Sequence, residues 1–519
     1  MNFSGFISDR RFQFLFVVLI GAALTWISGV YSGFFVSLND FWTVLYYGRH
    51  MTWEHKESLY NSFYPFGYAF IIGQLPYTYT IQLAYMLNAL LTGLLLASVA
   101  MLVREGGFTP AAVLAAGITI VQPLAFHYAN TPGPDIGAAA FPAFAVYLLW
   151  RDGLVRQGKV ETVQTSILIG ASMGLGCLWR SHVIVLAAVL LVFAFLFRRL
   201  ANVRLYGWTL ASFLAVLSIQ IVVDLLSGHK PLETAQIFNV YKLFYGLDWA
   251  NPPSREQLSQ LSILQLMISD PGSVIRTIWP YFKYLATFSL SGIALWIVAI
   301  DFPLKQFASF STWTILAYSL PLSFSDSPRA PLAVIGLTLV CAGLSLVPFH
   351  KRISVQFRVL RRPEVWVTML ALIVWAFPVV EWLKADWSFL EGNRMGYRIF
   401  KDMEQILLKN GATSPDQVFS NRYSYYLPTR PPYTTRHFSY TSNQWLWGFE
   451  EKYPYIPDDS WENFRESCLE QGIQFLVITP FAVDQAAFFG EIYENNFDEQ
   501  ALGVEFIAQR TTSRIFKFR

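Results

Sequence analysis

About eleven long apolar stretches constrain the fold of this 519-residue chain more than any other feature. An apolar helix needs roughly 20 residues to cross the hydrocarbon core of a bilayer, because its backbone polar groups can bond only within the segment. Hydrophobic residues make up 54% of the chain and charged residues 14%, which is more apolar material than one soluble core requires. The sequence therefore predicts a mainly α, polytopic membrane protein. The predicted spans are Phe12–Phe35, Ile81–Val103, Phe108–Phe126, Asp135–Trp150, Ser166–Trp179, Val183–Phe197, Tyr206–Leu226, Tyr281–Ile300, Phe307–Leu322, Ala330–Pro348 and Val365–Leu383.

The basic residues of the short loops predict how these spans are oriented. Lys and Arg resist translocation and collect on the cytoplasmic side of a membrane. The short loops on the opposite side contain only Arg180 and Arg329. We therefore expect a cytoplasmic amino terminus and, with an odd number of spans, an external carboxyl-terminal tail. The basic residues assigned to the cytoplasmic side are Arg10, Arg11, Arg104, Arg151, Arg156, Lys159, Arg198, Arg199, Arg204, Lys305, Lys351, Arg352, Arg358, Arg361 and Arg362.

Three regions are expected outside the membrane: residues 37–80, residues 227–280 and the tail after Lys384. In the tail, helical, strand-like and turn-rich pieces follow one another, which is typical of a small α/β domain. We predict a transmembrane domain over residues 1–383 and an extracytoplasmic α/β domain over residues 384–519. The elements expected in the tail are a helix over Arg394–Leu408 that stops at Gly411, a long irregular loop over Asn421–Pro457, a helix through Leu469 opened by a capping box of Asp459 and Glu462, and strands over Gln474–Thr479, Val504–Ala508 and Arg514–Phe518.

The charge and the cysteines limit the classes of function. The net charge of +3 is modest and resides mostly in the loops assigned to the cytoplasm, so nothing indicates a nucleic-acid partner. Cys177 and Cys341 lie within predicted spans, which leaves Cys468 alone in the tail. No disulfide is therefore expected within the external regions.

A metal site is one interpretation of the ionisable residues in the first external region. His50, Glu54, His55 and Glu57 provide suitable ligand types. Their spacing fits no specific site, so an ordinary solvated surface is the favoured interpretation. We expect no resident cofactor, and the sequence leaves dependence on a divalent metal open.

Two aspartates stand where external loops meet helices. Asp40 begins an amphipathic stretch, Phe41 to Tyr47, and Asp135 precedes a run of small residues. One interpretation is that each aspartate caps its helix, because a carboxylate accepts the free backbone N–H groups and complements the helix dipole. A carboxylate at the membrane surface also suits catalysis, since it can accept a proton from a bound hydroxyl. The two roles are compatible.

Arg180 and Arg329 differ from the other basic residues because they lie on the disfavoured side, next to spans. A cation drawn to the centre of a bilayer costs roughly 2.5 to 3.5 kcal/mol, so a compensating partner is expected. A lipid phosphate is one such partner, because the planar guanidinium matches phosphate oxygens bidentately. The alternatives are contact with ordinary lipid headgroups or pairing with an internal acid such as Asp326.

These features together resemble the GT-C superfamily of integral membrane glycosyltransferases. The resemblance rests on a short amino-terminal anchor, acids at Asp40 and Asp135, a Gly-rich fifth span that leads into Arg180-Ser181-His182, the segment Ser325-Asp326-Ser327-Pro328-Arg329, and a soluble external tail. Within the superfamily, the chain is most similar to the bacterial protein mannosyltransferase and aminoarabinose transferase group. The likeness covers nearly the whole chain in layout and implies a location in a bacterial plasma membrane.

The resemblance implies a reaction and roles for individual residues. The donor would be a polyprenyl-phosphate-linked sugar, and the acceptor a hydroxyl of a glycan, lipid or protein outside the membrane. Asp40 would act as the base for an inverting displacement, and Asp135 would position or polarise the acceptor or the sugar. Arg180 or Arg329 would stabilise charge on the departing phosphate, with His182 and Asp326 among the substrate-binding residues. Many relatives have two adjacent acids in the first loop, whereas this chain has Asn39-Asp40.

Two other classes of function fit the same sequence. A transporter or lipid flippase also has many spans with a few polar groups inside the membrane. Transporters often contain paired halves with broken helices, and no inverted repeat is evident in this chain. A non-catalytic assembly factor, whose tail binds a partner in the cell envelope, is the third class.

Overall fold

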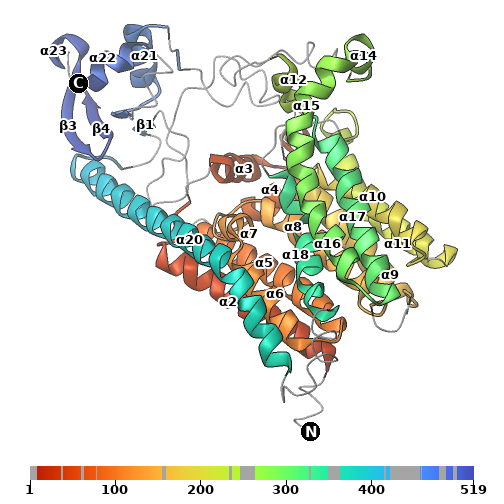
Figure 1. Cartoon of the computed structure of the whole chain (residues 1–519). Helices are drawn as coiled ribbons and strands as arrows, with labels where there is room; N and C mark the ends of the chain where they lie inside the picture. The colour runs from red at the N-terminus through yellow and green to blue at the C-terminus, as the bar shows by residue number, and fades with distance from the viewer. Residues whose placement is uncertain are drawn as a thin grey trace.

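A helical bundle, one very long helix and a small α/β unit make up the protein (Figure 1). The computed structural model describes residues 9–36, 39–59, 64–76, 79–154, 159–200, 202–232, 237–245, 263–325, 329–348, 363–413, 417–420, 456–457, 459–478, 487–494 and 499–519. The helices and strands are α2 (Arg10–Tyr31), α3 (Asn39–His50), η1 (Lys56–Leu59), α4 (Phe66–Gly73), α5 (Thr80–Glu105), α6 (Thr109–Val121), α7 (Pro123–Ala129), α8 (Asp135–Trp150), α9 (Val163–Trp179), α10 (Val183–Leu196), α11 (Val203–Leu226), α12 (Ile237–Tyr245), α14 (Ile263–Ser269), α15 (Pro271–Ala286), η3 (Thr287–Ser289), α16 (Leu290–Val298), α17 (Phe302–Leu322), η4 (Ala330–Val334), α18 (Ile335–Leu344), α20 (Pro363–Lys409), β1 (Val418–Ser420), α21 (Trp461–Glu470), β2 (Phe475–Ile478), α22 (Ala487–Glu494), α23 (Glu499–Leu502), β3 (Val504–Arg510) and β4 (Ser513–Phe518).

The eleven apolar stretches predicted from the sequence all fall on helices. Five helical segments in the described part of the chain are long and apolar enough to cross a membrane: α2, α5, α11, residues 271–298 and residues 330–348. The predicted span Phe108–Phe126 is broken, because α6 and α7 meet at a bend of 62°. Gln122 and Pro123 stand at this bend, where proline lacks the N–H that would continue the helix. Three shorter apolar helices, α8, α9 and α10, occur where spans were also predicted.

Small residues let the bundle helices approach closely. Neighbours in the bundle follow the order α2, α5, α8, α9 and α11. A side chain at Gly170 of α9 would stand 2.0 Å from the backbone oxygen of Thr209 in α11. A side chain at Gly93 of α5 would likewise stand 2.2 Å from the backbone oxygen of Val18 in α2. Close backbone approach at small residues is a common packing mode of membrane helices.

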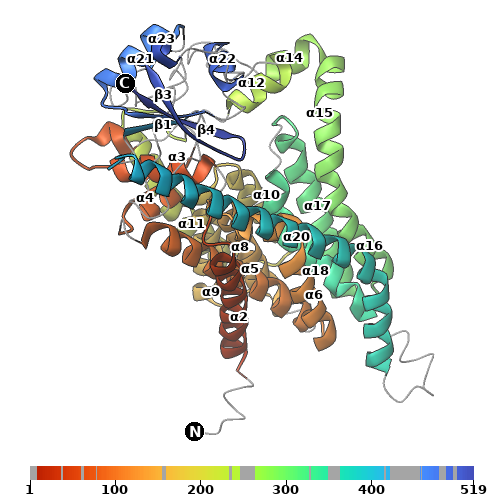
Figure 2. The same ribbon diagram turned by 90° about the vertical axis from the view of Figure 1, so that its left-hand side faces the viewer.

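A single helix, α20, connects the bundle to the α/β unit (Figures 1 and 2). The sequence predicted two separate helices here, Val365–Leu383 and Arg394–Leu408, but the structure has one helix of 47 residues. The residues between the two predicted helices, 384–393, include no proline, so no residue there prevents the helix from continuing. The domain boundary predicted after residue 383 therefore falls within α20. The helix ends at Lys409. Gly411, the predicted stop signal, has a φ of +99°, the left-handed conformation that commonly follows a helix.

The α/β unit contains a four-stranded sheet in the order β1-β2-β4-β3, in which β1 and β2 are parallel and the other pairs antiparallel. Alternate side chains of a strand point to opposite faces. Phe475 and Val477 of β2 accordingly belong to the core that includes Met403 and Leu407 of α20. Leu476 and Ile478 belong to a second core formed with α21 and α22. The three predicted strands are confirmed, and the short strand β1 was not predicted.

The helix α21 begins one residue later than the sequence predicted. Its N-cap is Ser460, whose hydroxyl accepts from the backbone N–H of Asn463. Asp459, the predicted cap, instead accepts from the side chain of Asn463. The predicted irregular loop over Asn421–Pro457 lies outside the described residues except for its last two.

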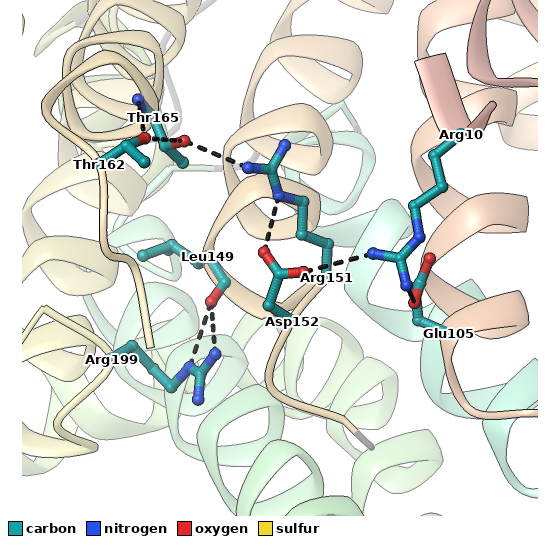
Figure 3. Close-up of polar contacts among 8 residues, drawn as sticks. All are labelled: Arg10, Glu105, Leu149, Arg151, Asp152, Thr162, Thr165 and Arg199. Atoms are coloured by element: carbon teal, nitrogen blue, oxygen red, sulfur yellow. Dashed lines mark hydrogen bonds and ion pairs between the residues drawn. The ribbon is translucent and has the colours of Figure 1, made fainter. Parts of the chain in front are cut away.

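A cluster of charged side chains joins four bundle helices at the carboxyl end of α8 (Figure 3). Asp152 accepts from Arg10 at 3.3 Å and from Arg151 at 3.0 Å. Arg10 also pairs with Glu105 at 3.1 Å, and Arg151 donates to Thr165 at 3.2 Å. All of these basic residues were assigned to one side of the membrane, and the structure places them at one end of the bundle.

Candidate functional site

Asp135 is the first residue of α8, and its carboxylate lies in the interior of the bundle. The residue is only 2% exposed. Its Oδ1 accepts from Nε of Arg180 at 2.8 Å and from Nη2 of the same residue at 2.5 Å. The N-cap position of α8 is occupied by Pro134, so the interpretation of Asp135 as the N-cap is wrong. The negative charge of the carboxylate still stands at the positive end of the helix dipole.

A second guanidinium meets the other oxygen of the same carboxylate. Nη1 of Arg329 lies 3.5 Å from Oδ2 of Asp135. Arg180 comes from the break between α9 and α10, and Arg329 comes from the residue before η4. These three side chains together carry one net positive charge. The side chain of Arg329 is 21% exposed against 8% for Arg180, so Arg329 is the more accessible cation.

Aromatic rings surround this ion-paired cluster. The guanidinium carbon of Arg180 lies 5.4 Å from the ring centre of Tyr64, and that of Arg329 lies 5.9 Å from the ring centre of Tyr128. Tyr68 and Trp179 are buried nearby, with ring centres 6.2 Å apart. Cations over aromatic faces are stabilised by the ring quadrupole, so these rings hold the guanidinium groups in a fixed orientation.

Three buried polar atoms beside the cluster have no hydrogen-bond partner among the described residues: the Tyr68 hydroxyl, Trp179 Nε1 and His182 Nε2. Most buried polar groups in folded proteins are hydrogen-bonded, so three unpartnered atoms in one place are unusual. Each can donate a hydrogen bond in at least one protonation state. The arrangement combines cations with neutral donors, which suits a ligand rich in oxygen.

Glycines set the positions of these side chains. A side chain at Gly137, in the first turn of α8, would stand 2.2 Å from Cδ1 of Trp179, so the indole needs a glycine there. A side chain at Gly67 would stand 2.8 Å from Cβ of Leu178, so α4 lies directly against α9. Asn88 of α5 fixes the segment before α8 by donating from Nδ2 to the backbone oxygens of Tyr128 and Thr131 at 3.1 and 2.9 Å.

Burial and the two cations determine the protonation of neighbouring groups. Burial lowers the pKa of His182 to about 3, and the positive charges of Arg180 and Arg329 act in the same direction. The imidazole is therefore neutral at physiological pH. Burial, together with the charge of Asp135, raises the pKa of Tyr68 far above its ordinary value, so the phenol keeps its proton.

The structure brings four of the six predicted site residues together: Asp135, Arg180, His182 and Arg329. The sequence predicted that an arginine on the cation-poor side pairs with an internal acid, and the acid found is Asp135. Asp326, the acid suggested from the sequence, lies outside the described residues. Asp40 lies in the first turn of α3, and its side chain is likewise outside the described part.

The possible metal ligands do not form a site in the described part of the chain. No group of three or more His, Cys, Asp or Glu side chains occurs there. Glu54 and His55 are exposed, as the solvated-surface interpretation requires, whereas the side chains of His50 and Glu57 lie outside the described residues.

Sequence analysis missed the aromatic residues of the cluster. The chain has 17 Trp, 26 Tyr and 44 Phe, and aromatic residues are common in the belts at membrane surfaces. Composition therefore did not distinguish Tyr64, Tyr68, Tyr128 and Trp179 from the other aromatic residues. One local signal was available, because Trp179 directly precedes Arg180 at the end of a glycine-rich helix.

Comparisons with known proteins identify the fold. No family model matches the sequence, and no curated protein matches it. The solved structure of ArnT from Cupriavidus metallidurans bound to undecaprenyl phosphate is 14% identical, covers 97% of each chain and has a TM-score of 0.55. The apo structure of the same ArnT is 14% identical, covers 98% of each chain and has a TM-score of 0.53. The resemblance to GT-C glycosyltransferases is thus confirmed at the level of the fold, over nearly the whole chain.

Proposed function

We propose that the chain is a membrane glycosyltransferase that moves a sugar from a polyprenyl-phosphate donor to an acceptor hydroxyl outside a bacterial plasma membrane. One observation carries the proposal. Two arginines that the sequence places on the cation-poor side of the membrane converge on one buried carboxylate, in a chain with the ArnT fold. The ArnT structure binds undecaprenyl phosphate, which supports a lipid phosphate as the ligand of the corresponding region here.

Arg180 and Arg329 act on the leaving group in this proposal. Negative charge grows on the phosphate as the bond to the anomeric carbon breaks, and preorganised cations in a site shielded from water stabilise such charge strongly. Asp135 is a positioning residue, because its two oxygens orient the two guanidinium groups before the donor arrives. Arg329, the more accessible cation, contacts the phosphate, and Arg180 anchors the arrangement.

Asp40 is the general base of the proposed reaction. Its helix, α3, packs on α4, which carries Tyr68. The two helices are in close backbone contact at Gly48 of α3, where a side chain would stand 2.0 Å from the backbone oxygen of Ala69. The acceptor hydroxyl gives its proton to Asp40 and forms a new bond to the anomeric carbon. The bond from that carbon to the phosphate oxygen breaks, its electron pair leaves with the polyprenyl phosphate, and the configuration inverts.

Transfer assays with the purified full-length protein test this proposal. The protein is incubated with a panel of polyprenyl-phosphate sugars and cell-envelope extracts, and products are identified by mass spectrometry. A general base contributes typically 10²- to 10⁴-fold to the rate, so Asp40→Asn is expected to lose activity by roughly that factor. Asp402→Asn, the same change at an exposed position of α20, is the matched control and is expected to keep full activity.

Two outcomes contradict the proposal. Ordinary transfer by a correctly inserted Asp40→Asn variant removes Asp40 as the base. Movement of a labelled solute across the membrane without any sugar transfer by the wild-type protein supports the transporter instead.

A further inference from the structure

Two buried polar side chains of α20 each have one polar atom without a hydrogen-bond partner among the described residues. Asp386 is 6% exposed and Asn393 is 5% exposed. Oδ2 of Asp386 and Nδ2 of Asn393 have no hydrogen-bond partner among the described residues. Glu404, further along the same helix, is equally buried but does have a partner. Asp386 and Asn393 therefore differ from Glu404, for which the protein itself supplies an interaction partner.

Both groups lie on one face of the helix, next to α7. They are seven residues apart, which places them on the same side and about 10 Å apart along the axis. Phe389 lies between them in the sequence. Its ring centre is 4.5 Å from that of His127 and 6.5 Å from that of Phe126. Figure 1 shows α20 running beside α7. The next residue of α7, Tyr128, is the one whose ring faces Arg329.

The chemistry of the pair disfavours the donor phosphate as its ligand, because neither side chain carries a positive charge. A carboxylate repels a phosphate, and an amide adds no compensating charge. A carboxylate oxygen accepts from hydroxyl groups, and an amide N–H donates to hydroxyl or ring oxygens. Burial raises the pKa of Asp386 to about 7, so the group can also donate a proton to a hydrogen bond near neutrality. Acceptor and donor together match the hydroxyls of a sugar.

We propose that Asp386 and Asn393 bind the hydroxyl-bearing, sugar-like head group of the acceptor, one helix away from the cation cluster. This inference rests on the proposed function and adds where its second substrate binds. Asp386 and Asn393 are about two helical turns apart, so one ligand can reach both only if its head group carries several hydroxyls spread over that distance.

The test uses the variants Asp386→Leu and Asn393→Leu in the full-length protein. The probe is the cell-envelope glycolipid extract, titrated at saturating donor. Each variant is expected to need about tenfold more extract for half-maximal transfer, the loss that corresponds to one hydrogen bond of ordinary strength to a buried group. Binding of undecaprenyl phosphate alone is expected to stay unchanged. Asp402→Leu, the same change at an exposed site of α20, is the control and is expected to keep the wild-type extract dependence.

Thermal unfolding without extract separates a ligand site from a structural role. Replacing an unpartnered buried polar group by an apolar one of similar size leaves stability unchanged or raises it. A lower melting temperature for Asp386→Leu, or an unchanged extract dependence in a wild-type background that transfers sugar, overturns the inference and leaves the proposed function standing.

A third measurement applies if the wild-type protein transfers no sugar and the proposed function fails. The extract is then expected to raise the melting temperature of the wild-type protein but not of Asp386→Leu. An equal rise in both proteins overturns the inference as well.

Discussion

The two ends of α8 carry the same charged motif in opposite surroundings. At the amino end, Asp135 is held between Arg180 and Arg329, and its side chain is 3% exposed. At the carboxyl end, Asp152 is held between Arg10 and Arg151, and its side chain is 48% exposed (Figure 3). Each aspartate lies between two guanidinium groups, and the exposed cluster has a second carboxylate, Glu105, which pairs with Arg10.

The difference in burial changes what each cluster does for the protein. An exposed ion pair contributes about 0–1 kcal/mol, because water and salt screen it. A buried pair must first offset the loss of hydration of its charges, and it is therefore a poor way to gain stability. The exposed cluster joins helices at low cost. The buried cluster preorganises cations, which is useful where a substrate charge must be bound.

The largest expected difference between the two ends is in stability. Asp135→Asn leaves buried guanidinium groups without their counter-charge and is expected to cost about 3–5 kcal/mol. Asp152→Asn is expected to cost less than about 1 kcal/mol. Chemical unfolding in detergent measures both values, and equal losses would show that the two clusters play the same role.

A double variant sharpens this stability comparison. Replacing Asp135 by Leu together with Arg180→Met removes both charges at once, and it is expected to recover much of the lost stability without recovering transfer. Recovery of transfer as well would remove Asp135 and Arg180 from the proposed mechanism.

The next effect concerns the use of the donor. Arg329→Ala is expected to weaken donor use roughly 10- to 100-fold, because a hydrogen bond to a charged group contributes about 1.5–3 kcal/mol. Arg10→Ala, the corresponding change at the exposed cluster, is expected to leave donor use unchanged. Initial rates at varied concentrations of polyprenyl-phosphate sugar measure both. Unchanged donor dependence in Arg329→Ala would take this residue out of the binding site.

A smaller effect is expected from pH. The folded protein keeps His182 neutral down to pH about 3, whereas the unfolded chain protonates it near its ordinary pKa of 6.5. His182 therefore costs no stability above pH 6.5, and stability falls as the pH decreases from there towards 3, by up to about 1.4 kcal/mol per pH unit. His182→Gln is expected to flatten this part of the curve. An identical pH dependence in both proteins would contradict the buried neutral imidazole.

The smallest expected effect is the response of the exposed cluster to salt. Raising the ionic strength screens Asp152 and its partners, so the difference in stability between the wild type and Asp152→Asn is expected to vanish at about 1 M salt, where the screening length is about 3 Å. The effect of Asp135→Asn is expected to persist under the same conditions. Chemical unfolding at low and high salt measures both differences, and loss of the Asp135 effect at high salt would mean that water reaches the buried cluster.

Features that depend on local sequence were predictable. The apolar stretches, the turn at Gly411 and the three strands of the tail each depend on composition or periodicity over a few residues, and the structure confirms them. The continuity of α20 was not predictable in this way, because a charged stretch inside a helix looks like the end of one. The cap of α21 differs by one residue because Asp459 and Ser460 are both good caps.

The sequence by itself determined that Asp135, Arg180 and Arg329 lie at the same end of the helical bundle, since the alternation of the apolar stretches along the chain puts all three residues at that end. Only the tertiary structure decided that both arginines contact the same carboxylate, and that Tyr68 and Trp179 lie beside it. These residues are far apart in the chain, and their meeting depends on how closely α4, α8 and α9 pack. That packing requires the absence of a side chain at Gly67 and Gly137, and neither loop charge nor apolar periodicity reveals such a requirement.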